Sequence, residues 1–217
     1  ININIPEGIL INRLTNKNIS LHDIELPNYP LIVKPNTEGS SLGISDTSVC
    51  HNIQQLETAL KKLNNFTEIV IEEYIPGYEI TNLIIGNPND YRFNEVILTS
   101  INDKIYFSQE VLGLKEKSQK LRKQYTASDF IAASMCQKIQ QTSQQIFEHM
   151  GARDIARIDY RVTEKGELYF LEINSVPRVS STSECAIICK KYNISFKDIL
   201  FEYMDTIDKR ISNREKI

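Results

Sequence analysis

The 217-residue chain combines 41% apolar residues with 25 basic and 28 acidic side chains, which gives a formal net charge of -3. This composition is typical of a globular protein with a sizeable core, and it excludes disordered and fibrous classes. The mixed charges give no electrostatic footprint for nucleic acid, so we expect no nucleic-acid partner.

The first half of the chain is predicted to form strands around one helix. Residues 6–8 predict a turn before a short strand, and residues 31–34 form an apolar strand that ends at Lys34. The loop 36–43 holds two glycines, which permits close approach of the backbone to an anion. Apolar residues recur three and four positions apart over 52–63, which predicts an amphipathic helix. Further strands are expected at 69–75, 80–85, 95–100 and 104–107.

The second half is predicted to contain three helices and a hairpin. Seven charged side chains between residues 109 and 125 indicate a mobile surface loop. Residues 126–129 carry a helix-start pattern, with a helix expected to end near residue 150. Cys185 and Cys189 are spaced for a helix, and Ser195 with Asp198 predicts a capping box before a final helix over 196–209.

The four cysteines form no C-x-x-C pair, and only three histidines are present. We therefore expect free thiols in a reducing compartment and no zinc site. No apolar run reaches the roughly 18 residues that span a bilayer, and no leader pattern opens the chain. We expect a cytoplasmic protein with no membrane partner.

Polar side chains cluster on the hairpin expected after residue 151. Arg157 and Asp159 alternate with apolar neighbours, as do Glu172 and Asn174, and the turn 163–166 joins the two stretches. A hairpin would bring these oxygen donors to one small patch. Two carboxylates and an amide suit Mg²⁺, which keeps positions for water and phosphate oxygens. The alternative is the ordinary polar face of an antiparallel hairpin.

Four phrases occur in the order and spacing of a known family. They are Val33-Lys34-Pro35 with the loop 38–43, the stretch 71–79, the stretch 156–160 and the stretch 171–177. On these phrases the chain resembles the D-alanine-D-alanine ligase family of the ATP-grasp superfamily, from Leu31 to about Tyr203. The resemblance implies an α+β ATP-grasp fold of two subdomains, with residues 1–90 forming the smaller and residues 91–217 the larger. It also implies that the N-terminal domain of such ligases is absent from this chain, which begins at Ile1.

The function implied by the resemblance is ATP-dependent ligation of two amino acids through an acyl phosphate. D-alanine is the default substrate, and the product would serve peptidoglycan and cell wall biogenesis. The implied cofactors are ATP and two Mg²⁺ ions, with Mn²⁺ as an alternative. A homodimer is the open alternative to a monomer. Two other functions stay open: a ligase of secondary metabolism with an altered acceptor, and a non-catalytic nucleotide-binding paralogue.

The resemblance also assigns roles to individual residues. Those expected to bind the nucleotide are Lys34 at the phosphates, Glu72, Glu73 and Ile75 near adenine, and Glu79 at the ribose. The expected metal ligands are Asp159, Glu172 and Asn174. The expected catalytic residues are Arg157, at the oxyanion of the tetrahedral intermediate, and Ser40, at the first substrate. The expected acceptor-site residues are Arg178, Ser183 and Glu184.

The chain departs from the family pattern at several of these positions. Arg178 stands where the family has a glycine, and Glu184 where it has an apolar residue, so acceptor identity is open. Glu73 stands where a lysine is common near adenine in the family. The family's phosphate-capping lysine also has no match, and Lys115 or Lys117 is its possible substitute.

Overall fold

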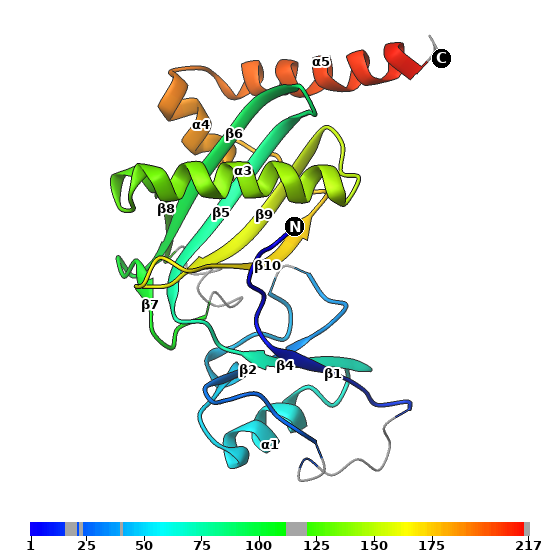
Figure 1. The fold of residues 1–217 in the computed structure, drawn as a ribbon, viewed down its shortest axis with the longest axis vertical. Coiled ribbons are helices and arrows are strands. Elements are labelled where there is room, and N and C mark those ends of the chain that lie inside the picture. The colour runs from blue at the N-terminus through cyan, green and yellow to red at the C-terminus, as the bar shows by residue number, and fades with distance from the viewer. Residues whose placement is uncertain (16–20, 22–23, 40, 112–120, 215–217) are drawn as a thin grey trace. The chain divides into compact units, whose positions relative to one another are not determined.

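The computed structural model describes residues 1–15, 21, 24–39, 41–111 and 121–214, which form two compact units (Figure 1). Unit 1 comprises Ile1–Asn4, Tyr78–Ser100 and Gln124–Ile217, and unit 2 comprises Ile5–Gly77 and Ile101–Lys123. Each unit combines antiparallel strands with helical segments, as the α+β expectation requires. The two units divide at other residues than the expected boundary at 90, because that boundary falls inside one hairpin, which β5 (Gly77–Asn87) and β6 (Asp90–Ile101) form.

Unit 2 is built on a four-stranded sheet in the order β1-β4-β2-β3. Its elements are β1 (Gly8–Asn12), β2 (Leu31–Pro35), η2 (Asp46–Ser48), β3 (Val49–Cys50), α1 (Ile53–Lys62), β4 (Glu68–Glu73) and β7 (Tyr106–Phe107). Alternate residues of β2 and β4, among them Val33 and Ile71, are fully buried and share a core with Leu56 of α1. The side chain of Asn52 caps α1 by accepting a hydrogen bond from the Gln55 amide at 3.0 Å.

Unit 1 is built on an antiparallel sheet in the order β10-β9-β5-β6-β8. Its elements are β5 (Gly77–Asn87), β6 (Asp90–Ile101), β8 (Arg122–Thr126), η3 (Ala127–Asp129), α3 (Ala133–His149), β9 (Ile155–Val162), β10 (Leu168–Asn174), α4 (Cys185–Tyr192) and α5 (Phe196–Arg214). Helix α3 lies across one face of this sheet, as Figure 1 shows.

The two faces of this sheet are covered by different helices. On the first face the hydroxyls of Ser143 on α3 and Tyr160 on β9 form a buried hydrogen bond of 2.7 Å. On the second face Leu83 and Ile97 share an apolar cluster with Ile188 of α4 and Ile199 of α5. Because side chains alternate along a strand, residues 157 and 159 belong to the second face.

Two expectations for residues 109–129 were wrong. Residues 122–126 form strand β8 at the edge of the sheet rather than a surface loop, because pairing with β6 satisfies their backbone hydrogen-bonding groups. The ring of Tyr125 also packs against that of Phe130, with the two ring centroids 5.1 Å apart. The helix-start pattern at 126–129 leads only to a 3₁₀ turn, since Thr126 makes no side-chain cap, and α3 begins at Ala133. The part of the expected loop at 112–120 lies outside the described residues.

Several other expectations were confirmed. Ser195 and Asp198 form the capping box before α5, with the Ser195 amide donating to Asp198 Oδ2 at 2.7 Å and the Asp198 amide donating to Ser195 Oγ at 3.2 Å. All four cysteines carry free thiols, as expected.

Membrane-spanning character is a separate observation. Across the described residues, no helix combines the length and the apolar character needed to cross a membrane.

Candidate functional site

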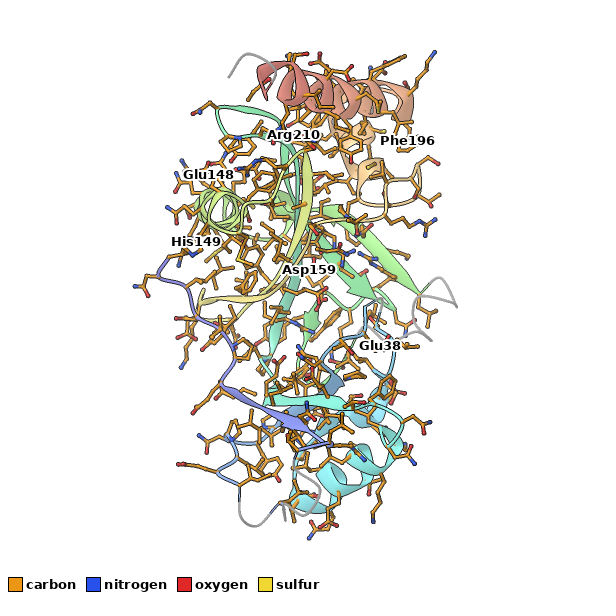
Figure 2. All side chains as sticks on the ribbon, turned by 90° about the vertical axis from the view of Figure 1, so that its right-hand side faces the viewer. Glu38, Glu148, His149, Asp159, Phe196 and Arg210 are labelled. Atoms are coloured by element: carbon orange, nitrogen blue, oxygen red, sulfur yellow. The ribbon has the colours of Figure 1, made fainter. Side chains whose placement is uncertain are left out.

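The hairpin of β9 and β10 brings four of the predicted side chains together. Asp159 lies directly opposite Glu172, and Arg157 lies opposite Asn174. Opposite residues of an antiparallel pair point to the same face, so the two pairs form one patch. This patch lies on the sheet face away from α3, and Figure 2 shows α3 end-on at one side of the sheet with Asp159 labelled at the other.

A β-bulge at Leu171 produces this alignment. The register of the hairpin steps by one residue between Phe170 and Glu172, so Leu171 has no partner opposite it. With an unbroken register, Leu171 would face Asp159, and Glu172 would face Ile158 on the side of α3. The extra residue therefore moves the Glu172 carboxylate to the patch.

Arg157 and Asp159 form the ionic centre of the patch. Arg157 Nη2 lies 2.8 Å from Asp159 Oδ2, and Arg157 Nε lies 3.1 and 3.2 Å from the two Asp159 oxygens. Glu172 Oε1 lies 3.6 Å from Arg157 Nη2, and Thr81 Oγ1 donates to Asp159 Oδ1 at 2.9 Å. Burial lowers the pKa of the Arg157 guanidinium, but Asp159 first, then Glu184 and Glu172, raise it by more, so the net pKa is raised. The site therefore holds a permanent positive charge.

Three oxygen-bearing groups border this guanidinium. The Asp159 side chain is mostly buried, whereas 63% of the Glu172 side chain is exposed. Asn174 Oδ1 accepts a hydrogen bond from the Val176 amide at 3.0 Å, which orients its amide group. Across the described ranges, no three His, Cys, Asp or Glu side chains gather into a group that could hold a metal. Two facing carboxylates and an amide oxygen are a donor set that a hard divalent cation can use when phosphate oxygens and water complete its shell.

A second ion pair lies two residues further along β9. Glu79 on β5 is opposite both Arg161 on β9 and Thr99 on β6. Arg161 Nη2 lies 2.7 Å from Glu79 Oε2, with 7% and 18% of these side chains exposed. Thr99 is fully buried, and its hydroxyl finds no hydrogen-bond partner in the part of the chain that the structure describes. Glu79 is thus held between a guanidinium and a buried hydroxyl-bearing residue.

The loop after β10 is organised by its own hydroxyl groups. Ser183 Oγ donates to the Ser180 carbonyl at 2.8 Å and accepts from the Ser180 amide at 3.2 Å. The side chain of Arg178 donates from Nη2 to Thr182 Oγ1 at 3.2 Å. The Ser183 hydroxyl therefore shapes the turn that leads into α4.

Glu184 follows this turn directly and is buried. Gln124 Nε2 on β8 donates to Glu184 Oε1 at 2.9 Å. The carboxylate also contributes to raising the Arg157 pKa, after burial, which lowers it, and Asp159, which raises it. The predicted site residue Glu184 therefore belongs to the same face as Arg157.

In unit 2 the structure pairs two of the predicted nucleotide-binding side chains. The ammonium of Lys34 on β2 forms a salt bridge with Glu72 on β4. Gly8 of β1 lies opposite Glu72, where a β-carbon would come within 2.7 Å of Glu72 Cβ. Because Gly8 has no side chain, β1 can lie close to β4 at Glu72.

Two further predicted residues of unit 2, Glu73 and Ile75, lie near the end of β4. Glu73 Oε2 accepts a hydrogen bond from the Glu7 amide at 3.3 Å. Ile75 is half-buried in the segment between β4 and β5. Ser40 lies outside the described residues, as do Lys115 and Lys117 in the segment considered for the capping lysine.

Three residues of the unit 1 face were not predicted: Thr81, Gln124 and Arg161. Thr81 and Arg161 lie two positions from predicted residues on the same strands, so period-two alternation extended by one step would have found them. Alternation could not have indicated Gln124, because its stretch was predicted to be a loop rather than a strand. Only the edge strand places it beside Glu184.

Comparisons with known proteins show the family to which the chain is related. A protein-family model, D-ala D-ala ligase C-terminus, matches residues 7–205. A D-alanine--D-alanine ligase of Azobacteroides pseudotrichonymphae is 32% identical over 82% of this chain and 52% of its own length. The vancomycin C-type resistance protein VanC2 of Enterococcus casseliflavus is 26% identical over 90% of this chain and 53% of its own length. The chain thus spans about half the length of these curated relatives.

Solved structures show the same fold. The D-alanine--D-alanine ligase of Bacillus anthracis superposes with a TM-score of 0.74 at 20% identity, over 98% of this chain and 64% of that one. The VanG D-Ala:D-Ser ligase of Enterococcus faecalis gives a TM-score of 0.71 at 22% identity, over 94% of this chain and 57% of that one. The expected ATP-grasp fold is confirmed by this likeness. Together with the family match over residues 7–205, it shows that the chain belongs to the D-alanine-D-alanine ligase family, through the C-terminal part of that family.

Proposed function

We propose that this protein is an ATP- and Mg²⁺-dependent ligase that joins two amino acids, with D-alanine as the default substrate. The observation that carries the proposal is the patch in which Asp159 and Glu172 face each other beside the guanidinium of Arg157. Family membership supports the reaction class, and a related ligase of Bacillus anthracis has been solved in complex with ATP. A reaction that uses ATP fits a cytoplasmic location.

The proposed ligands of Mg²⁺ are Asp159, Glu172 and Asn174, and the proposal includes two ions. The donor set fits, because Mg²⁺ binds proteins through one or two carboxylates and leaves room for substrate phosphates. When bound, the metal would neutralise charge on the phosphates as the terminal phosphoryl group moves. Thr81 supports this arrangement, since its hydrogen bond fixes one oxygen of Asp159.

The nucleotide-binding roles that the resemblance implies are proposed for each unit by itself. Within unit 2, Lys34 would contact phosphate oxygens, and its salt bridge with Glu72 holds the lysine in place before substrate arrives. Within unit 1, Glu79 would accept hydrogen bonds from the ribose hydroxyls. Arg161 orients that carboxylate through a mostly buried ion pair.

The proposed reaction has two bond-forming steps. A carboxylate oxygen of the first amino acid attacks the γ-phosphorus of ATP, the bond from that phosphorus to the bridging oxygen breaks, and ADP leaves. The neutral amine of the second amino acid then attacks the acyl carbon of the acyl phosphate. The carbon–oxygen bond to phosphate breaks, inorganic phosphate leaves, and the nitrogen gives up one proton.

Arg157 is the proposed stabiliser of the oxyanion formed in the second step. Its pKa is raised by Asp159 against the opposing effect of burial, so it is charged throughout the reaction. Two hydrogen-bonding nitrogens anchored on Asp159 fix the plane of the guanidinium. A fixed charge of this kind stabilises developing negative charge without reorganisation, which is usually the largest contribution to catalysis.

The test is phosphate release from ATP by the purified protein with Mg²⁺ and a panel of D- and L-amino acids. We expect release with D-alanine, and strongly reduced release in Glu172→Gln, which keeps the size of the side chain but removes its charge. Glu167→Gln is the matched control, because Glu167 is an exposed glutamate at the turn of the same hairpin. Unchanged release in Glu172→Gln, or release that needs no divalent cation, would contradict the assignment.

A further inference from the structure

Arg157 and Thr81 share the two oxygens of Asp159 unequally. Oδ1 accepts a hydrogen bond from Arg157 Nε at 3.1 Å and one from Thr81 Oγ1 at 2.9 Å. Oδ2 accepts from Arg157 Nε at 3.2 Å and from Arg157 Nη2 at 2.8 Å. Within the described residues, the hydrogen bonds to Oδ2 thus all come from the guanidinium, and the shorter one comes from Nη2.

The oxygen Oδ2 belongs to the donor set proposed for Mg²⁺. Glu172 lies directly opposite Asp159, and its Oε1 is 3.6 Å from Arg157 Nη2. Nη2 therefore lies within ion-pair distance of both carboxylates that the metal ion is proposed to use. A guanidinium nitrogen and Mg²⁺ cannot occupy the same side of one carboxylate oxygen, and two cations at such short range repel each other. The neutral Thr81 hydroxyl on Oδ1 is not repelled in this way.

A second pair of the same shape lies elsewhere in unit 1 (Figure 2). Arg210 of α5 donates from Nε to the two oxygens of Asp154 at 2.8 and 3.0 Å and from Nη2 to Oδ2 at 2.6 Å. Asn87 donates to Asp154 Oδ1 at 2.9 Å, in the place that a threonine takes at Asp159. Asp159 differs in having the Glu172 carboxylate directly opposite, with 63% of that side chain exposed to an arriving cation. The Arg210 pair is thus a reference for a guanidinium with a structural role.

We propose that Arg157 Nη2 and a divalent cation compete for Asp159 Oδ2, so that the ion pair of the structure covers the metal site until the cation arrives. This inference rests on the proposed ligase function, because it takes Asp159 and Glu172 as metal ligands. On metal binding Nη2 leaves Oδ2, while Nε keeps its hydrogen bond to Oδ1 and holds the guanidinium nearby. The N–H donors of Nη2 thereby become available to the oxyanion only at a site that already holds its metal.

A different role for Arg157 would be to orient Asp159 for the metal. In that case the loss of the guanidinium loosens the carboxylate and weakens metal binding. Under competition, the same loss uncovers Oδ2 and removes a repelling charge, so metal binding becomes tighter. The two roles therefore differ in the sign of the change in metal affinity.

The experiment titrates Mg²⁺ alone into the purified protein, without nucleotide, and follows the side-chain amide signal of Asn174 by NMR. We expect Arg157→Met to bind Mg²⁺ more tightly than the unchanged protein by about 10-fold or more, because the guanidinium repels a doubly charged ion at the same carboxylate. Arg210→Met is the matched control, since it removes the guanidinium of the reference pair, and it should leave the affinity unchanged.

A second measurement uses the unchanged protein and so does not depend on the folding of Arg157→Met. The side-chain nitrogen signals of Arg157 and Arg210 are followed during the same titration. The Nη2 signal of Arg157 should change with the midpoint that Asn174 reports, because its hydrogen bond to Oδ2 is lost, whereas its Nε–H signal should persist. The signals of Arg210 should stay constant.

The possible failures are distinguishable. Weaker Mg²⁺ binding in Arg157→Met, or constant Arg157 signals while Asn174 reports saturation, overturns the inference and leaves the ligase function standing. No response of Asn174 to Mg²⁺, with or without a non-hydrolysable ATP analogue, overturns both the inference and the metal assignment. Competition between Mg²⁺ and Arg157, without phosphate release from ATP with any amino acid pair, supports the inference and overturns the ligase function.

Discussion

Strand β9 presents Ile158 and Tyr160 to α3 on one face and Arg157, Asp159 and Arg161 to the polar patch on the other. The first set is fully buried and makes apolar contacts plus one hydrogen bond. The second set is organised by ion pairs to carboxylates on β9 and on the neighbouring strands. The two sets share one backbone, so packing behind the sheet holds the charged groups in place in front of it. Substitutions on the two faces should therefore separate loss of chemistry from loss of stability.

The largest expected effect is on the polar face. Glu172→Gln should lower ATP turnover by about 100-fold or more, because a lost metal ligand weakens binding at least as much as a lost supporting group. The melting temperature should change little, since 63% of this side chain is exposed and exposed pairs contribute little to stability. Turnover assays and thermal melts of the same preparation check both parts. A large fall in melting temperature would show that Glu172 has a packing role and would break the comparison.

The next effect tests whether the polar face also contributes to stability. Arg161→Met should lower the free energy of unfolding by about 3–5 kcal/mol, because it leaves the mostly buried Glu79 carboxylate without its cation. Denaturant titration measures this change, and Arg161→Lys should recover part of it. A loss below about 1 kcal/mol would mean that solvent reaches Glu79 and that this pair behaves as a surface pair.

On the packing face, Ile158→Ala should lower the free energy of unfolding by about 2–5 kcal/mol through lost apolar contacts and a cavity. Ile158 is fully buried, so the site should collapse only in part. Turnover per folded molecule should stay within about 2-fold, a ratio that corresponds to about 0.4 kcal/mol. Active-site titration after refolding checks this value, and a selective loss of turnover would show that the two faces are coupled.

The smallest expected effect concerns the hydroxyl pair behind the sheet. Tyr160→Phe should lower the free energy of unfolding by about 1 kcal/mol, because the Ser143 hydroxyl loses its partner at 2.7 Å. The double variant with Ser143→Ala should recover part of that loss, since it removes both polar groups. Denaturant titration of the single and double variants makes the comparison, and equal losses in both would contradict the pairing.

Much of the fold was predictable because alternation and capping act locally. The burial of Leu31, Val33 and Ile71 follows period two, and the Ser195–Asp198 box marks the start of α5. Edge strand β8 was not predictable in the same way. Its charged residues resemble a loop in isolation, and only pairing with β6 makes them a strand.

The candidate patch was predicted on residue types, but its geometry depends on a feature that was missed. Plain alternation from the turn at 163–166 would have turned Glu172 toward α3. A signal was present in the sequence, because Leu168 and Phe170 are apolar while Glu172 and Asn174, at the same parity, are polar. Such a break of phase within one strand indicates a bulge. Gln124, the partner of Glu184, depends on a contact of the edge strand β8, which local patterns do not reveal.

The unpaired Leu171 divides the hairpin into two segments whose strand registers differ by one residue. Adding or deleting a residue in the turn would leave the register at Leu171 unchanged. The same change between Leu171 and Glu172 would turn Glu172 and Asn174 toward the side of α3. An engineer who grafts this patch onto another scaffold must therefore transplant the irregularity along with the ligands.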